Sequence, residues 1–481
     1  MFKYVRAVLI VVSLLFAWSC DPEPHSIKLS DTYITFNGKG NDARTVTVIS
    51  DPTGWKAVAS ASWIQITEMT AQTLTFTVDD NEGTEERRGS IDITAGKAQV
   101  AIEILQLTET ATSAQYRTMF DYENGVVMSP SGKYAGGWYA SIAGDALSFH
   151  VVVYDIEADK KIEIGTYPGS LLEFNWPTAI SDDGLFFIET VADGVYAFSL
   201  DGTYEKVATP AGMVGRAIVS GVATNGTKVG FAMKDMEDGH GSLYWPVKWV
   251  NGEAQELQMP KTYRDELEYT SAEFLNGVMA RGISANGEIV YGTCWDNWDF
   301  GMVYWDQNGD VRFVGEDVRK VTPVKMFNEG GVEYDYNLVE GVMCTASSTQ
   351  SSPSGKWLAG TFTKEELNAE RTEILKTSYP AFYNTETKKT YLLSEYSGVY
   401  GLTATDDGKG IVGGGSTCTV VDIESGIRIG SGAEWIQSEF GIVVPTCRID
   451  LCCAGGNVVF ASVPYADQLI GMIDGFFYVA R

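Results

Sequence analysis

The stretch Ile283-Ser-Ala-Asn-Gly-Glu-Ile-Val-Tyr-Gly292 joins two apolar segments through a short polar turn. Asn286 can accept a local backbone hydrogen bond, and Gly287 can adopt the positive φ that side chains resist, so the stretch predicts a tight hairpin. The same turn recurs at intervals of 42 to 68 residues, with its glycine at Gly132, Gly184, Gly226, Gly287, Gly355 and Gly408. The segment Cys453-Ala-Gly-Gly-Asn-Val458 is a degenerate seventh copy. Periods of this length predict a repeat architecture, with insertions in the two longest units.

The segments that follow each turn read as short strands. An apolar strand comes first and often ends in glycine, as in Val290-Tyr-Gly292, and the next strand carries aromatic residues, as in Met302-Val-Tyr-Trp305. Three or four short strands in a unit of about 40 to 55 residues are typical of a propeller blade. We therefore predict a β-propeller of six or seven blades over residues 115–481, in which residues 116–127 close the ring against residues 473–479. An open stack or a large sandwich is the alternative, and residues 364–378 are the one stretch predicted to be helical.

These repeat units have a family resemblance. The stretch from Ile283 to Gly292, followed by Val303-Tyr-Trp305, resembles the HAF-type extracellular repeat and, more loosely, the strand pairs of TolB-like propellers. The resemblance implies a propeller that works outside the cell.

Residues 27–107 alternate apolar and polar side chains over short runs broken by polar turns, which predicts a small immunoglobulin-like β-sandwich. The motif residues resemble those of the BACON domain, a sandwich common at the N-termini of secreted carbohydrate-active proteins: Trp55, Ser62-Trp63-Ile64, Asn81, Glu86-Arg-Arg-Gly-Ser-Ile91 and Ile104-Leu-Gln106. The resemblance implies a glycan-binding domain or a spacer. Because Trp55 and Trp63 stand among alternating apolar neighbours, core positions and therefore a spacer are favoured.

The leader predicts the location of the protein. Lys3 and Arg6 precede an apolar run over residues 7–18, and a small-residue motif ends at Cys20. We predict that residues 1–19 are a lipoprotein signal peptide and that Cys20 is lipidated; a conventional signal peptide is the alternative. Residues 20–26 form an acidic, proline-containing linker. The chain is thus expected to be an outer membrane lipoprotein, surface-exposed, that meets the membrane only through its acyl anchor.

Composition narrows the partners and the chemistry. The formal net charge of −28 argues against nucleic acid and anionic lipid, whose phosphates need Lys and Arg. The chain holds three histidines, and its six cysteines beyond Cys20 show no zinc-ligand spacing. It contains no G-x-S-x-G, P-loop or H-E-x-x-H motif. We therefore predict no metal, no cofactor and no catalytic residue set, and we leave the pairing of the cysteines open.

One short segment is a candidate ligand site. Trp295 and Trp298 could offer flat apolar faces to pyranose rings, while Asp296, Asn297 and Asp299 could bind hydroxyl groups. The alternative is that these aromatic residues pack between blades. The sequence thus favours a non-catalytic surface lipoprotein that binds a glycan or a surface protein partner through propeller loops. The alternatives are a glycoside hydrolase or lyase with carboxylates on the central face, and a structural subunit of a surface complex.

Overall fold

The computed structural model describes most of the chain from Ser26 to Ala480 and divides it into two compact units, Met1–Thr112 and Ser113–Arg481. The described residues exclude 1–25, 31, 37, 40, 42, 84–86, 107–114, 120–125, 144–145, 170–171, 192–193, 236–240, 262–274, 297–299, 346–349, 416, 445, 457, 464–474 and 481. The predicted signal peptide, Cys20 and nearly all of the acidic linker therefore lie outside the described residues. Within the described part, no helix has the length and apolar character needed to cross a membrane.

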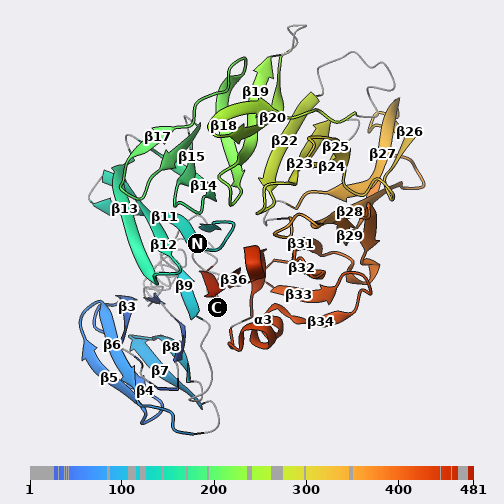
Figure 1. The fold of residues 1–481 in the computed structure, drawn as a ribbon. Coiled ribbons are helices and arrows are strands. Elements are labelled where there is room, and N and C mark those ends of the chain that lie inside the picture. Colours follow the sequence, from blue (N-terminus) through green and yellow to red (C-terminus); the bar gives the residue numbers. More distant parts are fainter. Residues whose placement is uncertain are drawn as a thin grey trace, which may run out of the picture. The chain divides into compact units, whose positions relative to one another are not determined.

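The first unit is a sandwich of two four-stranded sheets, as predicted (Figure 1). One sheet has the order β1 (Ser26–Leu29), β3 (Arg44–Asp51), β6 (Thr73–Val78) and β5 (Ile64–Met69). The other has the order β2 (Tyr33–Phe36), β8 (Ala98–Gln106), β7 (Arg87–Ala95) and β4 (Lys56–Ala59). The apolar alternation of each strand places one face in the shared core, because successive side chains point to opposite faces.

Both tryptophans of this unit serve packing. Trp55 is buried in the core, and its Nε1 donates a hydrogen bond to the Ala71 carbonyl at 3.0 Å. Trp63 is partly buried against the same core, and the Arg87 guanidinium carbon lies 4.5 Å from its ring centroid. The predicted core role of Trp55 is confirmed, and one face of Trp63 is covered by Arg87.

The polar motif residues of the first unit tie two chain segments together. Gln106 is fully buried, and its Nε2 donates to the carbonyls of Gly38 and Asp79 at 3.1 and 2.9 Å. Arg87 Nε donates to Gln106 Oε1 at 2.8 Å, and its Nη2 contacts the Asp79 carbonyl. Arg87 therefore holds a backbone turn and not a carboxylate.

The second unit is built from antiparallel groups of strands that succeed one another along the chain (Figure 1). The first group is β10 (Val126–Met128), β11 (Tyr134–Ala143), β12 (Ala146–Asp155) and β13 (Lys160–Pro168); the second is β14 (Phe174–Ile180), β15 (Phe186–Thr190), β16 (Gly194–Phe198) and β17 (Tyr204–Lys206). The third is β18 (Val214–Val222), β19 (Lys228–Asp235), β20 (Ser242–Val250) and β21 (Glu253–Glu256); the fourth is β22 (Leu275–Ile283), β23 (Val290–Asp296), β24 (Phe300–Trp305) and β25 (Val311–Phe313).

Three further groups complete this unit. The fifth is β26 (Lys320–Phe327), β27 (Glu333–Met343), β28 (Trp357–Leu367), β29 (Ile374–Asn384) and β30 (Lys389–Leu392). The sixth is β31 (Tyr400–Ala404), β32 (Lys409–Gly414), β33 (Thr417–Asp422) and β34 (Arg428–Ser431). The last is β35 (Arg448–Cys452), β36 (Val458–Val463) and β37 (Gly475–Ala480), to which β9 (Gln115–Met119) adds a fourth strand.

These groups form a closed propeller. Each contacts the next in chain order, and Val126 and Met128 of the first group share a hydrophobic cluster with Val458 and Phe460 of the last. By hydrogen bonding the described strands make six sheets, because the third and fourth groups are joined by the single pair Tyr244–Gly277. The predicted closure is confirmed in β9, where Tyr116 pairs with Val479; Val126 and Val127 instead begin the first group.

The repeated turns are the tight hairpins that the sequence predicts. Their glycines, including Gly456 of the degenerate copy, have φ between 66° and 88°. Each glycine N–H donates to the carbonyl three residues earlier, as from Gly287 to Ser284 at 2.9 Å. The turns also bind one another: Ser131 Oγ donates to Asp182 at 2.6 Å, and Ser354 Oγ donates to Asp406 at 2.7 Å. One face of the ring thus carries a series of hydrogen bonds between neighbouring sheets.

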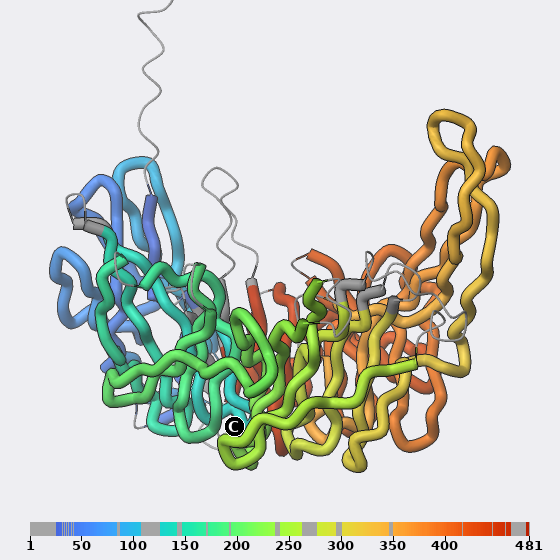
Figure 2. Tube along the Cα trace, turned by 90° about the horizontal axis from the view of Figure 1, so that it is seen from above, coloured from blue at the N-terminus to red at the C-terminus, as the bar shows by residue number. Residues whose placement is uncertain are grey.

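The predicted helix over residues 364–378 is wrong. This segment is the tip of the hairpin β28–β29, which with β26–β27 forms an arm that extends past the neighbouring sheets (Figure 2). Glu365 is buried, accepts a hydrogen bond from the Val339 N–H at 3.0 Å and pairs with Lys376 at 2.9 Å, which joins the two hairpins.

The helix of the described part that was not predicted, α3, spans Gly432–Phe440. It begins with a capping box in which Ser431 accepts from the Glu434 N–H and the Glu434 carboxylate accepts from the Ser431 N–H. It ends at Gly441 in the left-handed conformation.

Candidate ligand-binding site

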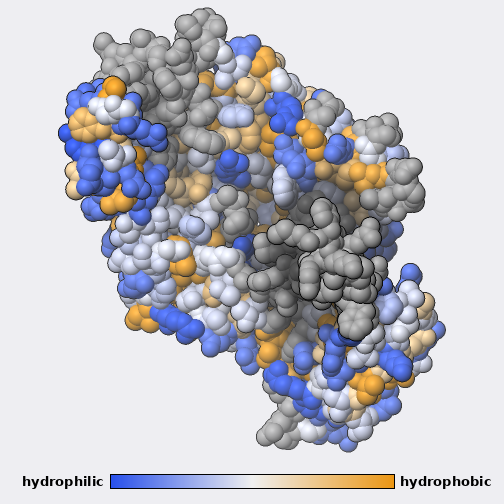
Figure 3. All heavy atoms as spheres, turned by 180° about the vertical axis from the view of Figure 1, so that it is seen from behind, coloured by the Kyte–Doolittle hydropathy of each residue, from blue (hydrophilic) through white to orange (hydrophobic). Residues whose placement is uncertain are grey.

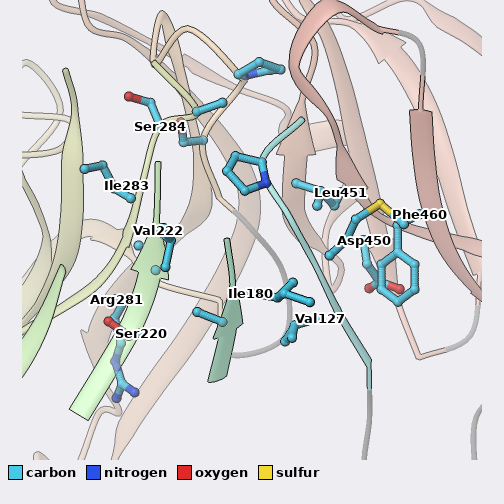
Figure 4. A pocket seen from close by; sticks show the side chains of 18 of the residues that line it. Val127, Ile180, Ser220, Val222, Arg281, Ile283, Ser284, Asp450, Leu451 and Phe460 are labelled. Atoms are coloured by element: carbon cyan, nitrogen blue, oxygen red, sulfur yellow. The ribbon is translucent and has the colours of Figure 1, made fainter. Parts of the chain in front are cut away.

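The first strands of several groups surround a cavity of about 360 Å³ at the centre of the second unit, which we call the narrow cavity (Figure 4). Its walls come from β10, β14, β18, β22 and β35, which are distant from one another in the sequence. In Figure 4, Ser220 and Arg281 lie on the opposite side from Asp450 and Phe460. A closed ring therefore brings together side chains that no local motif could unite.

The repeat register explains which residues face this cavity. In five groups the residue three positions before the first turn residue lines the narrow cavity: Val126, Thr178, Ser220, Arg281 and Asp450. The turn fixes where each first strand ends, so the same offset gives the same orientation in each group. The axis is thus lined by one apolar, two hydroxyl, one cationic and one anionic side chain from this position.

A second cavity of about 1090 Å³, the wide cavity, adjoins the narrow one. The two share the lining residues Pro177, Thr178, Ser220, Arg281 and Tyr291, so they are parts of one axial space. The wide cavity adds aromatic walls from Trp176, Phe231 and Tyr244. Trp176 is 54% exposed, which is unusual for so large an apolar side chain.

The charged residues of this space are few. Arg216 pairs with Glu189 at 3.5 Å in the wide cavity, and Arg448 pairs with Asp450 at 2.8 Å beside the narrow one. The Arg281 guanidinium carbon lies 5.9 Å from the Phe231 ring centroid. In the described lining, each cavity therefore holds one carboxylate, and each of these carboxylates is already in an ion pair.

The ionisable groups in the buried wall stay neutral. Burial raises the pKa of the Tyr291 hydroxyl far above its ordinary value, and this hydroxyl accepts a hydrogen bond from the Gln350 N–H at 3.2 Å. Burial also raises the pKa of the Cys344 thiol to about 11, and its Sγ donates to the Gly292 carbonyl at 3.2 Å. A thiol with a raised pKa is a poor nucleophile near neutral pH. The six cysteines of the described part form no disulfide. Among all residues that the structure describes, no cluster of histidine, cysteine, aspartate and glutamate side chains could hold a metal ion.

The candidate segment of the sequence lies at the end of the hairpin β23–β24. Trp295 and Asp296 belong to β23, where Trp295 pairs with Phe300, but their side chains and all of Asn297, Trp298 and Asp299 lie outside the described residues. Thr293, Cys294 and Gly301 of the same hairpin line the wide cavity. The five-residue site stays a prediction.

Sequence reasoning missed three residues of the wide cavity: Trp176, Arg216 and Arg281. The sequence did contain a signal for Arg281, because it lies three positions before Ser284, the first residue of its turn. That position is informative only once the structure shows that residues at this offset face the axis. Trp176 and Arg216 had none, because their strands carry register shifts between Phe174 and Pro177 and between Val214 and Ile218. A bulge changes which face a side chain occupies, so alternation does not locate them.

The fold and the axial space define a β-propeller that follows an immunoglobulin-like sandwich, an architecture that fits a binding role. Residues 53–107 match the BACON family, described as a putative binding domain, N-terminal. The first unit is therefore a BACON domain. No curated protein matches the chain.

Solved propeller structures resemble the chain weakly. TolB from Acinetobacter baumannii is 12% identical, with a TM-score of 0.29, over 63% of this chain and 58% of its own. The polysaccharide lyase Uly1 is 7% identical, with a TM-score of 0.40, over 76% of this chain and 91% of its own. The propeller domain of the Trilobed protease from Pyrococcus furiosus is 10% identical, with a TM-score of 0.34, over 84% and 93%.

Proposed function

We propose that this protein is a non-catalytic lipoprotein of the outer membrane that captures an extracellular glycan in its axial space, with the BACON domain as a spacer. The observation that carries the proposal is the wide cavity, whose lining combines the exposed Trp176 with hydroxyl and guanidinium groups. Sugar sites combine a flat apolar face with a few polar groups that fix orientation. Surface hydropathy alone does not select a site, because hydrophobic residues are scattered among hydrophilic ones on the face in Figure 3.

The charges of the described lining favour binding over glycoside hydrolysis. Glycosidases use two carboxylates within one site, roughly 5 to 10 Å apart. Glu189 and Asp450 line different cavities, and each is paired with an arginine. The described lining of the axial space therefore offers glycoside hydrolysis no pair of unpaired carboxylates.

A glycan array tests the proposal. The full chain in detergent micelles is applied to an array of neutral, uronate-containing and sulfated oligosaccharides, and binding to at least one class is expected. Absence of binding to every class would overturn the glycan proposal. Any bound sugar should be recovered intact after overnight incubation, since cleavage would overturn the non-catalytic assignment.

The membrane anchor is tested separately. The wild-type chain and a Cys20→Ala variant are expressed in a Gram-negative host, and the cells are fractionated. We expect the wild-type chain in the outer membrane fraction with a fatty-acyl mass on Cys20, and the variant outside that fraction. An unmodified Cys20 in the mature wild-type protein would overturn the lipoprotein assignment.

A partner protein is the second candidate ligand. The arm exposes three large apolar side chains, Val332, Tyr334 and Leu375. Exposed apolar side chains that lie together can mark a surface that binds another protein. If the partner is a protein, a purified complex should lose affinity in a Tyr334→Ser variant and keep it in a Trp176→Ala variant.

A further inference from the structure

The charge of the wide cavity differs from that of the chain. The full sequence carries a formal net charge of −28. The charged side chains of the described lining of the wide cavity are Glu189, Arg216 and Arg281, which sum to a positive charge. A positive lining in an acidic protein attracts anions to that place and disfavours cations.

Arg281 is the charged residue of this lining that is available to bind an anionic ligand. The carboxylate of Glu189 already pairs with Arg216 at 3.5 Å. Arg281 is exposed to the cavity, lines both the wide and the narrow cavity, and forms no ion pair with the carboxylates of the described residues. Its guanidinium lies near the Phe231 ring, which leaves the edge with its N–H groups available to a ligand. A planar guanidinium fork matches a carboxylate through two parallel hydrogen bonds.

Arg281 of β22 and the exposed Trp176 of β14 line the same cavity, and β18 of the third group stands between their two strands. Trp176 offers a flat apolar face, which packs against the C–H face of a pyranose ring. A glycan that contains carboxylate-bearing sugars can satisfy both groups, whereas a neutral glycan leaves the arginine without a charged ligand and an acidic peptide makes less use of the indole face.

We propose that the axial space selects glycans that contain uronic acid, with Arg281 binding the uronate carboxylate and Trp176 packing on the sugar ring. This inference rests on the proposed glycan-binding function. It adds the class of sugar and the two residues that recognise it.

Calorimetry with a matched pair of ligands tests the inference. The full chain in detergent micelles is titrated with hexagalacturonate and with its fully methyl-esterified form, in which each carboxylate is a neutral methyl ester on the same sugar backbone. We expect the free acid to bind at least about tenfold more tightly, because a hydrogen bond to a charged group is worth about that factor or more. The affinity for the free acid should fall as salt is added.

Variants assign the effect to the two residues. Arg281→Gln should weaken binding of hexagalacturonate by about 10- to 100-fold and remove the preference over the ester, while Arg281→Lys should restore part of both. Trp176→Ala should weaken both ligands, by about tenfold. Arg428→Gln is the matched control, because Arg428 lies on the outermost strand β34 in an exposed pair with Glu434 at 3.1 Å. It should change neither affinity, and thermal unfolding should be the same for all four variants.

The outcomes separate this inference from the proposed function. Equal affinity for the acid and the ester, or array binding to neutral sugars alone, would overturn the uronate inference and leave glycan binding standing. Binding to sulfated sugars without binding to uronates would also overturn it. Failure of every glycan on the array would overturn the proposed function itself.

Discussion

Alanine substitutions at two repeat glycines separate the conformational demand of a turn from the packing between sheets. Gly355 and Gly226 have the same φ of 78°. A Cβ on Gly355 would lie 2.5 Å from Cγ1 and 2.8 Å from Cβ of Ile289 on the neighbouring sheet, whereas a Cβ on Gly226 would meet nothing within 4 Å. The two positions therefore share the backbone cost and differ in steric contact.

The expected losses follow from these distances. A side chain in the left-handed region costs about 1–2 kcal/mol, offset by about 0.4–1 kcal/mol because alanine restricts the unfolded chain. Overpacking against Ile289 adds about 1–3 kcal/mol at Gly355 alone, because the clash includes a Cβ that cannot rotate away. Gly226→Ala should thus cost about 1 kcal/mol and Gly355→Ala about 2–4 kcal/mol.

Urea unfolding of the full chain, followed by tryptophan fluorescence, measures both variants. Gly355→Ala should have the lower midpoint, and its penalty should shrink in an Ile289→Ala background, where the blocking atoms are removed. Equal midpoints for the two glycine variants, or additive losses in the double variant, would refute the claim that contact between neighbouring sheets constrains the turn.

Three further predictions concern buried groups. Glu365→Ala should lower the unfolding free energy by about 1–3 kcal/mol, because the Val339 N–H loses its acceptor. The control Glu366→Ala removes an exposed pair with Lys364 and should cost less than about 0.5 kcal/mol. Equal losses in urea melts would count against the proposed role of Glu365 in joining the two hairpins. Burial raises the pKa of Cys418 from 9.0 to about 11, so between these two pH values the folded state keeps a proton that the unfolded chain releases. The contribution of this thiol to the unfolding free energy is therefore complete below pH 9 and is lost as the pH rises towards 11. Cys418→Ala should therefore flatten the fall of unfolding free energy between pH 9 and 11 by about 1.4 kcal/mol per pH unit, and an unchanged slope would argue against a buried thiol there. Trp55→Ala should destabilise the BACON domain by about 3–5 kcal/mol in thermal melts, and a loss below about 1 kcal/mol would contradict its core position.

Much of the fold could be predicted because the residues that form each turn are adjacent in the sequence. The glycine that needs a positive φ is visible in every copy, and even Cys453–Gly456 keeps the hydrogen bond from glycine to the carbonyl three residues earlier. The arm was misread for the opposite reason. Its strands leave the main core, so Lys364 and Glu366 carry charges outward and the apolar alternation that identifies a strand is lost.

The binding space was harder to predict than the strands. Arg281 and Trp176 line one cavity only because successive groups pack around a common axis, and nothing in either local sequence marks them as parts of one site. The indole of Trp176 and the segment around Trp298 look alike in sequence terms, since both are tryptophans beside polar residues. Trp176 becomes a candidate through its exposure in the wall of the wide cavity, which is a property of the assembled sheets.

The pairing of β9 with β37 also sets the order of events in biosynthesis. Strand Gln115–Met119 can find its partner only after Gly475–Ala480 has been made, so the last sheet stays incomplete while the other groups are already available to fold. During synthesis the ring would therefore be completed last, after the BACON domain and the earlier groups have been made. A premature stop before Gly475 would leave the edges of β9 and β36 unpaired, and such edges are sites for aggregation and proteolysis.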